Sequence, residues 1–140
     1  MVILTVTLTL YLNDYPKEYG FLKIIEVVSE HENIVFATPV YWYSMSGLMK
    51  VFFDRLTDLV TVKKITGREL KNKSIFLLSV GNDKELPHGF EIPFKLTSDY
   101  FGWLYKSSLY LSIKESSDQI AEKKTFFMIQ IQSNIQNKDL

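Results

Sequence analysis

The chain has 140 residues, which is about the size of one domain. Its 16 basic residues balance its 16 acidic ones, which excludes a protein built mainly to coat nucleic acid or an anionic membrane. Cysteine is absent and histidine occurs twice, so we expect no disulfide scaffold, thiol catalysis, iron–sulfur cluster or metal site.

The first segment, residues 2–12, is predicted to be a strand. Thr5, Thr7 and Thr9 alternate with apolar residues, and this period of two is typical of a strand with one more polar face. A signal peptide is not expected, because no basic residue precedes the apolar run and no small-residue cleavage site follows it. No segment approaches the ~20 apolar residues that span a bilayer. We therefore expect a cytoplasmic protein.

Seven further segments alternate between helix and strand patterns. Apolar residues three to four apart predict helices, and short, almost wholly apolar runs predict buried strands. In chain order, we predict a helix at 17–30, a strand at 33–38, a helix at 47–62, a strand at 74–80, a helix at 92–104, a strand at 107–113 and a helix at 116–131. This alternation favours a single α/β domain over residues 1–140, with a mostly parallel sheet and helices on both faces. Such sheets bind ligands at the carboxyl ends of their strands.

The loop after the second predicted strand, residues 38–47, is the strongest candidate site. It reads Thr-Pro-Val-Tyr-Trp-Tyr-Ser-Met-Ser-Gly and holds no acid, base or thiol. Its amides, hydroxyls and planar side chains suit a flat conjugated ring better than the hydrolysis of a bond. Ser46 is predicted to cap the next helix, and Gly47 to let backbone approach a ligand closely. The alternative is an aromatic-rich surface loop or a dimer contact.

The stretch 37–56 resembles the NAD(P)H-dependent FMN reductase family. The family pattern is T-P-x-Y-x-x-x-x-x-G followed by a helix bearing K-x-F-x-D-R. The chain matches it at Thr38, Pro39, Tyr41, Gly47, Lys50, Phe52, Asp54 and Arg55. Residues 79–83 look like the family's second flavin loop, and the resemblance covers about residues 13–113. It implies a flavodoxin-like three-layer sandwich and an oxidoreductase that passes hydride from NAD(P)H through FMN to a quinone, an azo compound or free flavin.

By this resemblance, the flavin carries the chemistry and two loops of the protein hold it. The implied cofactor-binding residues are Thr38, Pro39, Val40, Tyr41, Trp42, Tyr43, Ser44, Ser46, Gly47, Ser79, Gly81 and Asp83. The family also implies a homodimer that acts on a small-molecule acceptor, with neither nucleic acid nor membrane as a partner.

The chain departs from the family at its N-terminus. Family members begin with a strand, a Gly/Ser/Asn-rich loop and a helix that bind the FMN phosphate, whereas the first glycine here is Gly20. Residues 2–12 look more like the family's second strand, so we expect about four strands instead of five, with the central one missing.

Three explanations of this departure stay open. In the first, the chain is a truncated module that binds FMN weakly or not at all and acts as an interaction partner. Alternatively, an earlier start of the reading frame or a partner subunit supplies the missing unit. In the third case, residues 2–12 shift into the central position and leave four strands.

Other residues have simpler explanations. Asp54 and Arg55 are expected to be solvated helix charges, and His88 an incidental loop residue. Asp83 and Lys84 touch a ligand or belong to a turn. A basic stretch attracts a nucleotide phosphate or is simply a solvated connector; it consists of Lys63, Lys64, Arg68, Lys71 and Lys73. A C-terminal apolar run is expected in the core or in a subunit contact; it consists of Phe126, Phe127, Met128, Ile129 and Ile131.

Overall fold

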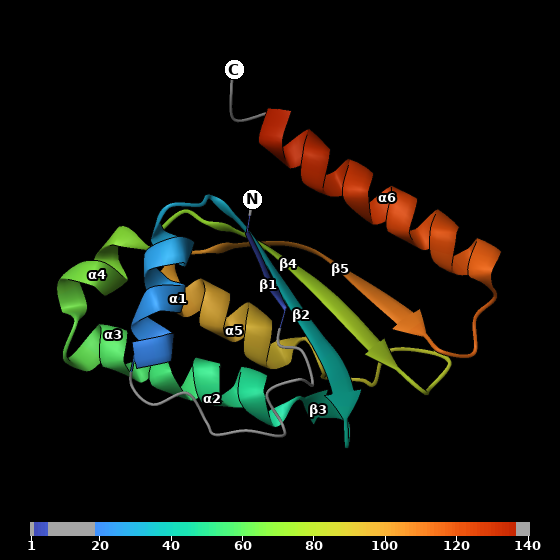
Figure 1. Cartoon of the computed structure of the whole chain (residues 1–140), viewed down its shortest axis with the longest axis horizontal. Helices are drawn as coiled ribbons and strands as arrows, with labels where there is room; N and C mark the ends of the chain where they lie inside the picture. The colour runs from blue at the N-terminus through green and yellow to red at the C-terminus, as the bar shows by residue number, and fades with distance from the viewer. Residues whose placement is uncertain (1, 6–18, 137–140) are drawn as a thin grey trace.

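The computed structural model describes residues 2–5 and 19–136, which form strands and helices in alternation (Figure 1). The elements in chain order are β1 (Val2–Thr5), α1 (Tyr19–Ser29), β2 (Asn33–Tyr41), β3 (Ser44–Met45), α2 (Gly47–Arg55), α3 (Thr57–Thr61), α4 (Lys64–Glu69), β4 (Ser74–Gly81), α5 (Ile92–Phe101), β5 (Leu104–Ser112) and α6 (Ser117–Gln136). No helix among them is long and apolar enough to cross a bilayer.

The four main strands form one parallel sheet in the order β1-β2-β4-β5, and the short β3 pairs antiparallel with β2. The predicted α/β class with a mostly parallel sheet is therefore confirmed. Because the main strands run in the same direction, β2, β4 and β5 end at one edge of the sheet, with β3 beside the end of β2 (Figure 1). This carboxyl edge is where open parallel sheets bind ligands.

The position of β1 corrects one expectation. Val2 pairs with Ile34 and Thr5 with Ala37, so β1 lies directly beside β2. In the flavodoxin order 2-1-3-4-5, the place beside the third strand belongs to the first strand of the fold. β1 therefore takes the position of the family's first strand and not that of its second strand, as in the third explanation above. It is the edge strand of the sheet that the described residues form. The remainder of the predicted strand, residues 6–12, lies outside the described residues.

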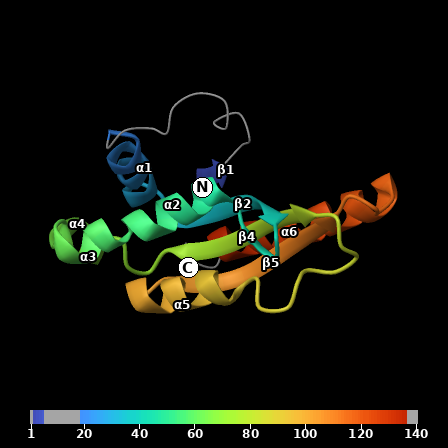
Figure 2. The same ribbon diagram turned by 90° about the horizontal axis from the view of Figure 1, so that it is seen from below.

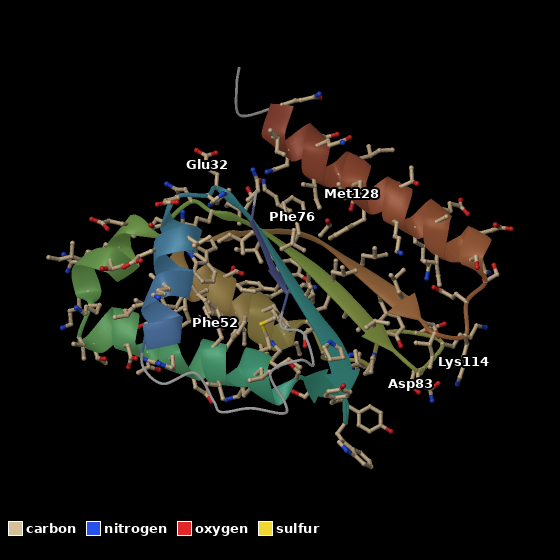
Figure 3. The ribbon with its side chains drawn as sticks, viewed as in Figure 1. Glu32, Phe52, Phe76, Asp83, Lys114 and Met128 are labelled. Carbon is tan, nitrogen blue, oxygen red and sulfur yellow. The ribbon has the colours of Figure 1, made fainter. Side chains whose placement is uncertain are left out.

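Two apolar cores lie on the two faces of the sheet. The larger one faces α1 to α5, and there the ring of Phe36 lies 5.3 Å from that of Phe53 and 6.1 Å from that of Phe94. The smaller one faces α6, where Phe76 and Phe127 meet edge to face at 6.1 Å. Figure 2 shows α6 across the sheet from the other helices, and Figure 3 shows Phe76 on the α6 side. Much of the high aromatic content is therefore core packing.

Several boundaries differ from the sequence pattern. The helix predicted at 47–62 breaks at Leu56, because Leu56 N–H bonds to the carbonyl of Phe53 and Leu59 N–H to that of Leu56, which tightens the turn. The predicted basic connector contains α4. Gly67 allows α4 to pack there, since a Cβ on it would lie 2.4 Å from the carbonyl oxygen of Leu59.

The last two predicted elements also move. Gly102 adopts a φ of 67°, which ends α5 three residues earlier than predicted and lets β5 begin at Leu104 instead of residue 107. Ser116 caps α6 by accepting a hydrogen bond from the Gln119 N–H at 3.3 Å. The helix then continues to Gln136, beyond the predicted end at residue 131.

Candidate functional site

A row of three polar residues crosses the sheet near its carboxyl edge. Thr38 of β2 pairs with Ser79 of β4, and Ser79 pairs with Tyr110 of β5. Thr38 and Ser79 are buried, and the Ser79 hydroxyl donates to the carbonyl of Leu109 at 3.5 Å. The structure therefore brings the beginnings of both predicted loops together, and it adds Tyr110, which the sequence analysis missed.

The first loop, residues 38–46, is closed at its base by side-chain hydrogen bonds. The Ser46 N–H donates to the Thr38 hydroxyl at 3.0 Å, and that hydroxyl donates to the carbonyl of Pro39 at 3.0 Å. The Ser46 hydroxyl in turn accepts from the Met49 N–H at 3.3 Å, which confirms Ser46 as the predicted cap of α2. The loop is thus fixed at the point where α2 begins.

The tip of this loop is a tight hairpin, where the sequence predicted an irregular loop. Tyr41 pairs with Ser44, which leaves Trp42 and Tyr43 as a two-residue turn with φ values of 49° and 64°. Two positive φ values are the signature of the type I′ turn, which usually takes Asn-Gly. For bulky residues this backbone costs roughly 1–2 kcal/mol each.

Burial does not offset this strain in the isolated chain. Trp42 is 94% exposed and Tyr43 is 70% exposed. Strained backbone concentrates at binding sites, where its cost is tolerated for function. The strained and exposed aromatic turn therefore makes this loop a candidate binding surface.

The entrance to α2 offers room beside the loop. Among the described residues, no heavy atom lies within 4 Å of the place that a Cβ on Gly47 would occupy. The first amides of a helix have no partner within the helix and are free to donate to a ligand. Gly47 therefore fits its predicted role of exposing backbone.

At Gly81 the structure shows a close contact that requires a glycine. A Cβ there would lie 2.8 Å from the hydroxyl oxygen of Tyr110 and 3.2 Å from Cβ of Val40. The close approach that requires glycine is therefore made by the side chains of Tyr110 and Val40, and the prediction that Gly81 contacts the cofactor stays a prediction. Tyr110 is a further candidate residue of the site, and the sequence could have indicated it because it lies near the carboxyl end of a neighbouring strand.

Tyr110 also holds the second loop. Its hydroxyl donates to the main-chain carbonyl of Asp83 at 2.8 Å. Burial and the negative charge of Asp83 raise the pKa of Tyr110 above its usual value of 10, so the hydroxyl keeps its proton at neutral pH. Tyr110 contacts the backbone of Asp83 and not its carboxylate, and Asp83 as a whole is exposed. Figure 3 shows Asp83 and Lys114 at the same corner of the molecule.

Most of the weaker candidates lie away from this row, while Lys84 lines a surface pocket together with Tyr110. Asp54 forms an exposed ion pair with Lys50, and Arg55 pairs with Asp58 at 3.4 Å while lying 4.7 Å from the centre of the Phe21 ring. His88 is exposed in the connection between β4 and α5, as is Lys84. These residues behave as surface groups.

One residue of the basic stretch, Lys73, is buried and does not belong to an exposed basic surface. Lys73 is only 6% exposed, and its ammonium group donates to the carbonyls of Ser29 and His31 at the end of α1, at 3.0 and 2.9 Å. It therefore supports the fold. The other members are exposed: Lys63, Lys64, Arg68 and Lys71.

The C-terminal apolar run is divided between core and surface. Phe127 and Ile131 are buried against the sheet, whereas three other residues remain exposed. These are Phe126, Met128 and Ile129.

Comparison with known proteins gives a family match and one curated relative. The family model for NADPH-dependent FMN reductase matches residues 4–105. A Bacillus subtilis (strain 168) protein, YwqN, bears a name that describes an NAD(P)H-dependent FMN-containing oxidoreductase. It is 30% identical over 70 residues, which cover 49% of this chain and 39% of that protein. The match thus spans about two fifths of the relative's length.

Solved structures share the fold. A general stress protein 14 of Treponema denticola, solved in complex with FMN, has a TM-score of 0.65 at 18% identity, over 85% of this chain and 76% of that chain. An NADPH-quinone reductase of P. pentosaceus has a TM-score of 0.66 at 15% identity, over 79% and 73%. A Trp repressor binding protein of Bacillus subtilis has a TM-score of 0.64 at 23% identity, over 75% and 65%. At these identities the likeness shows the flavodoxin-like fold.

Proposed function

Because the chain belongs to the NADPH-dependent FMN reductase family, we propose that it binds FMN at the carboxyl edge of its sheet and passes hydride from NAD(P)H to a small acceptor. The observation that carries this proposal is the Thr38–Ser46 hydrogen bond of 3.0 Å, which fixes the aromatic loop beside the Thr38–Ser79–Tyr110 row. The acceptor is a quinone, an azo compound or free flavin, and the working unit is a homodimer.

The residues present fit a flavin ring. Thr38, Ser46 and Ser79 bring uncharged hydroxyl groups to the base of the site, and the backbone at Gly47 is open. Trp42 and Tyr43 offer planar surfaces that are exposed and can lie against a conjugated ring. An uncharged, partly apolar wall of this kind suits an aromatic cofactor with a polar edge.

When bound, FMN supplies the hydride-transfer chemistry, and the protein supplies binding and orientation. In this division of labour, the Thr38 hydroxyl sets the path of the loop, and the aromatic turn covers part of the ring. The amides of Gly47 and Leu48 would donate hydrogen bonds, since that of Met49 already donates to the Ser46 hydroxyl. The first loop contains no carboxylate, ammonium or imidazole group, and its hydroxyl and aromatic side chains serve to bind and orient the ring. Their contribution to the rate is positional.

The experiment is a titration of the purified full chain with FMN, followed by flavin fluorescence. We expect quenching that saturates at micromolar FMN, and NADPH oxidation when a quinone is added. Trp42→Ala should weaken binding, whereas Phe126→Ala, which removes an exposed aromatic ring from α6 across the sheet, should leave it unchanged. Absence of quenching in the wild-type chain would sink the proposal.

A second candidate function is an interaction module that does not bind FMN productively. The exposure of Trp42 and Tyr43 favours it as well, because exposed aromatic residues are enriched in protein interfaces. The same titration separates the two. An interaction module would take up no FMN, and Trp42→Ala would instead change its association state, measured by sedimentation.

A further inference from the structure

We infer that Tyr110 is a positioning residue of the candidate site, because its hydroxyl and ring hold residues 81–83 in the conformation that the cofactor would meet. The effect of Tyr110 on FMN binding rests on the proposed function. Its effect on the conformation of residues 81–83 rests on contacts within the protein alone.

The segment 81–83 is tied to the end of β5 at both of its ends. The Ile113 N–H donates to the carbonyl of Gly81 at 2.9 Å, and the Tyr110 hydroxyl donates to the carbonyl of Asp83 at 2.8 Å. The strand pairing between β4 and β5 stops at Gly81 and Ser112. The Tyr110 side chain therefore extends the attachment two residues past the end of the paired strands.

The ring of Tyr110 adds a packing contact to this hydrogen bond. A Cβ on Gly81 would lie 2.8 Å from the Tyr110 hydroxyl oxygen, 3.3 Å from its Cε2 atom and 3.2 Å from Cβ of Val40. Tyr110 and Val40 thus close over Gly81 from the two neighbouring strands. This packing links the start of the second loop to β2, the strand from which the first loop departs.

The backbone that carries Tyr110 is itself anchored. The Lys123 ammonium lies 3.5 Å from the carbonyl oxygen of Tyr110 and forms an ion pair with Glu115. Glu115 also accepts a hydrogen bond from the Ser112 N–H at 3.3 Å. A side chain on a supported strand positions a loop better than one on a second loop does.

The test compares Tyr110→Phe with a matched control, Tyr105→Phe. Both residues lie on β5, and each variant removes one hydroxyl that donates a hydrogen bond of 2.8 Å, to Asp83 in the first case and to Glu91 in the second. Amide hydrogen exchange of the chain without FMN reports the loop directly. Affinity for FMN, measured by fluorescence titration, reports the site.

We expect Tyr110→Phe to speed exchange of the Ile113 amide, which donates to the Gly81 carbonyl at the start of this segment, and to weaken FMN binding, each by about five- to tenfold, the equivalent of one lost hydrogen bond. Tyr105→Phe should change neither quantity. Unchanged exchange of the Ile113 amide in Tyr110→Phe overturns the inference, and so does faster exchange with unchanged FMN affinity. If the wild-type chain binds no FMN, the proposed function fails, and the exchange data alone decide whether Tyr110 holds the loop.

Discussion

The amide of Ser46 donates to the hydroxyl of Thr38 at 3.0 Å, and this bond closes the base of the hairpin whose tip is formed by Trp42 and Tyr43. Both partners are 3% exposed, so water does not replace the bond readily if one partner is lost. The conformation of the aromatic turn therefore depends on one buried hydroxyl. The threonine at the start of the loop motif therefore has a structural role, because its hydroxyl accepts the hydrogen bond that closes the loop.

Thr38→Val tests this dependence, because valine keeps the shape of the side chain and removes the acceptor. The Ser46 amide would then be buried without a partner, and we expect the free energy of unfolding to fall by about 1–3 kcal/mol. Thr61→Val, which removes an exposed threonine hydroxyl on α3, should cost less than about 0.5 kcal/mol. Urea denaturation measures both variants. Equal losses in the two would contradict the role of Thr38.

Replacing Trp42-Tyr43 with Asn-Gly tests the strain in the hairpin. Asn-Gly adopts two positive φ values at little cost, so relief of the strain at both positions should raise the free energy of unfolding by about 2–4 kcal/mol, less the roughly 0.5–1 kcal/mol that the chain entropy of glycine costs. The same change removes the exposed aromatic surface and should weaken FMN binding. Thermal denaturation and FMN titration of one protein measure the two effects. A variant that is no more stable than the wild type would argue against a strained turn.

Gly81→Ala tests the packing of Tyr110 over the second loop. The added methyl group would lie 2.8 Å from the Tyr110 hydroxyl oxygen, so either the ring or the loop must move. We expect a loss of about 1–3 kcal/mol in the free energy of unfolding, which is typical of overpacking. In the double variant with Tyr110→Phe the cost should be smaller than the sum of the two single costs, since both act on one contact. Strict additivity in urea denaturation would show that the two residues are independent.

Glu91 provides a prediction about pH. Burial alone would raise its pKa, but hydrogen bonds from Lys95, Ser108 and Tyr105 outweigh burial and hold the pKa below its usual value of 4.5. A carboxylate with a lowered pKa in the folded state stabilises the fold above its unfolded pKa, and this contribution is lost as the pH falls through the folded pKa.

We therefore expect Glu91→Gln to lower the free energy of unfolding by about 0.5–1.5 kcal/mol at pH 7. The difference from wild type should shrink progressively below pH 4.5, the usual value for this group. Urea denaturation at several pH values between 3 and 7 measures it. A penalty that is constant over this range would rule out the charged form of Glu91 as its source.

The strands could be predicted from the sequence because burial leaves a strong pattern there. Val35 and Phe76 face α6, while Ile34 and Ile75 face the other helices, so both faces of β2 and β4 require apolar residues. The first loop was also predictable, since it combines a family motif with an unusual group of aromatic residues. The cap at Ser46 follows from local chemistry that any helix shares.

The other features depend on contacts between distant residues. The position of β1 beside β2 is a choice of pairing partner, and the alternation of threonines does not specify a partner. The hairpin was missed because Trp-Tyr is not a typical sequence for a type I′ turn. Tyr110 was missed because its role depends on a contact with Gly81. In the sequence, a glycine at that position is explained equally well by the close approach of a ligand.

The helix α6 runs for 20 residues, but only Phe127 and Ile131 are buried, and an Asn134–Asn33 hydrogen bond of 2.7 Å fastens its far end. An element held by so few contacts opens at lower free energy than the sheet beneath it. Each such opening would bring Val35, Phe76 and Leu109 into water together. The rate at which the purified protein aggregates would then be set by the detachment of α6 and the self-association of the exposed strands, and not by unfolding of the sheet.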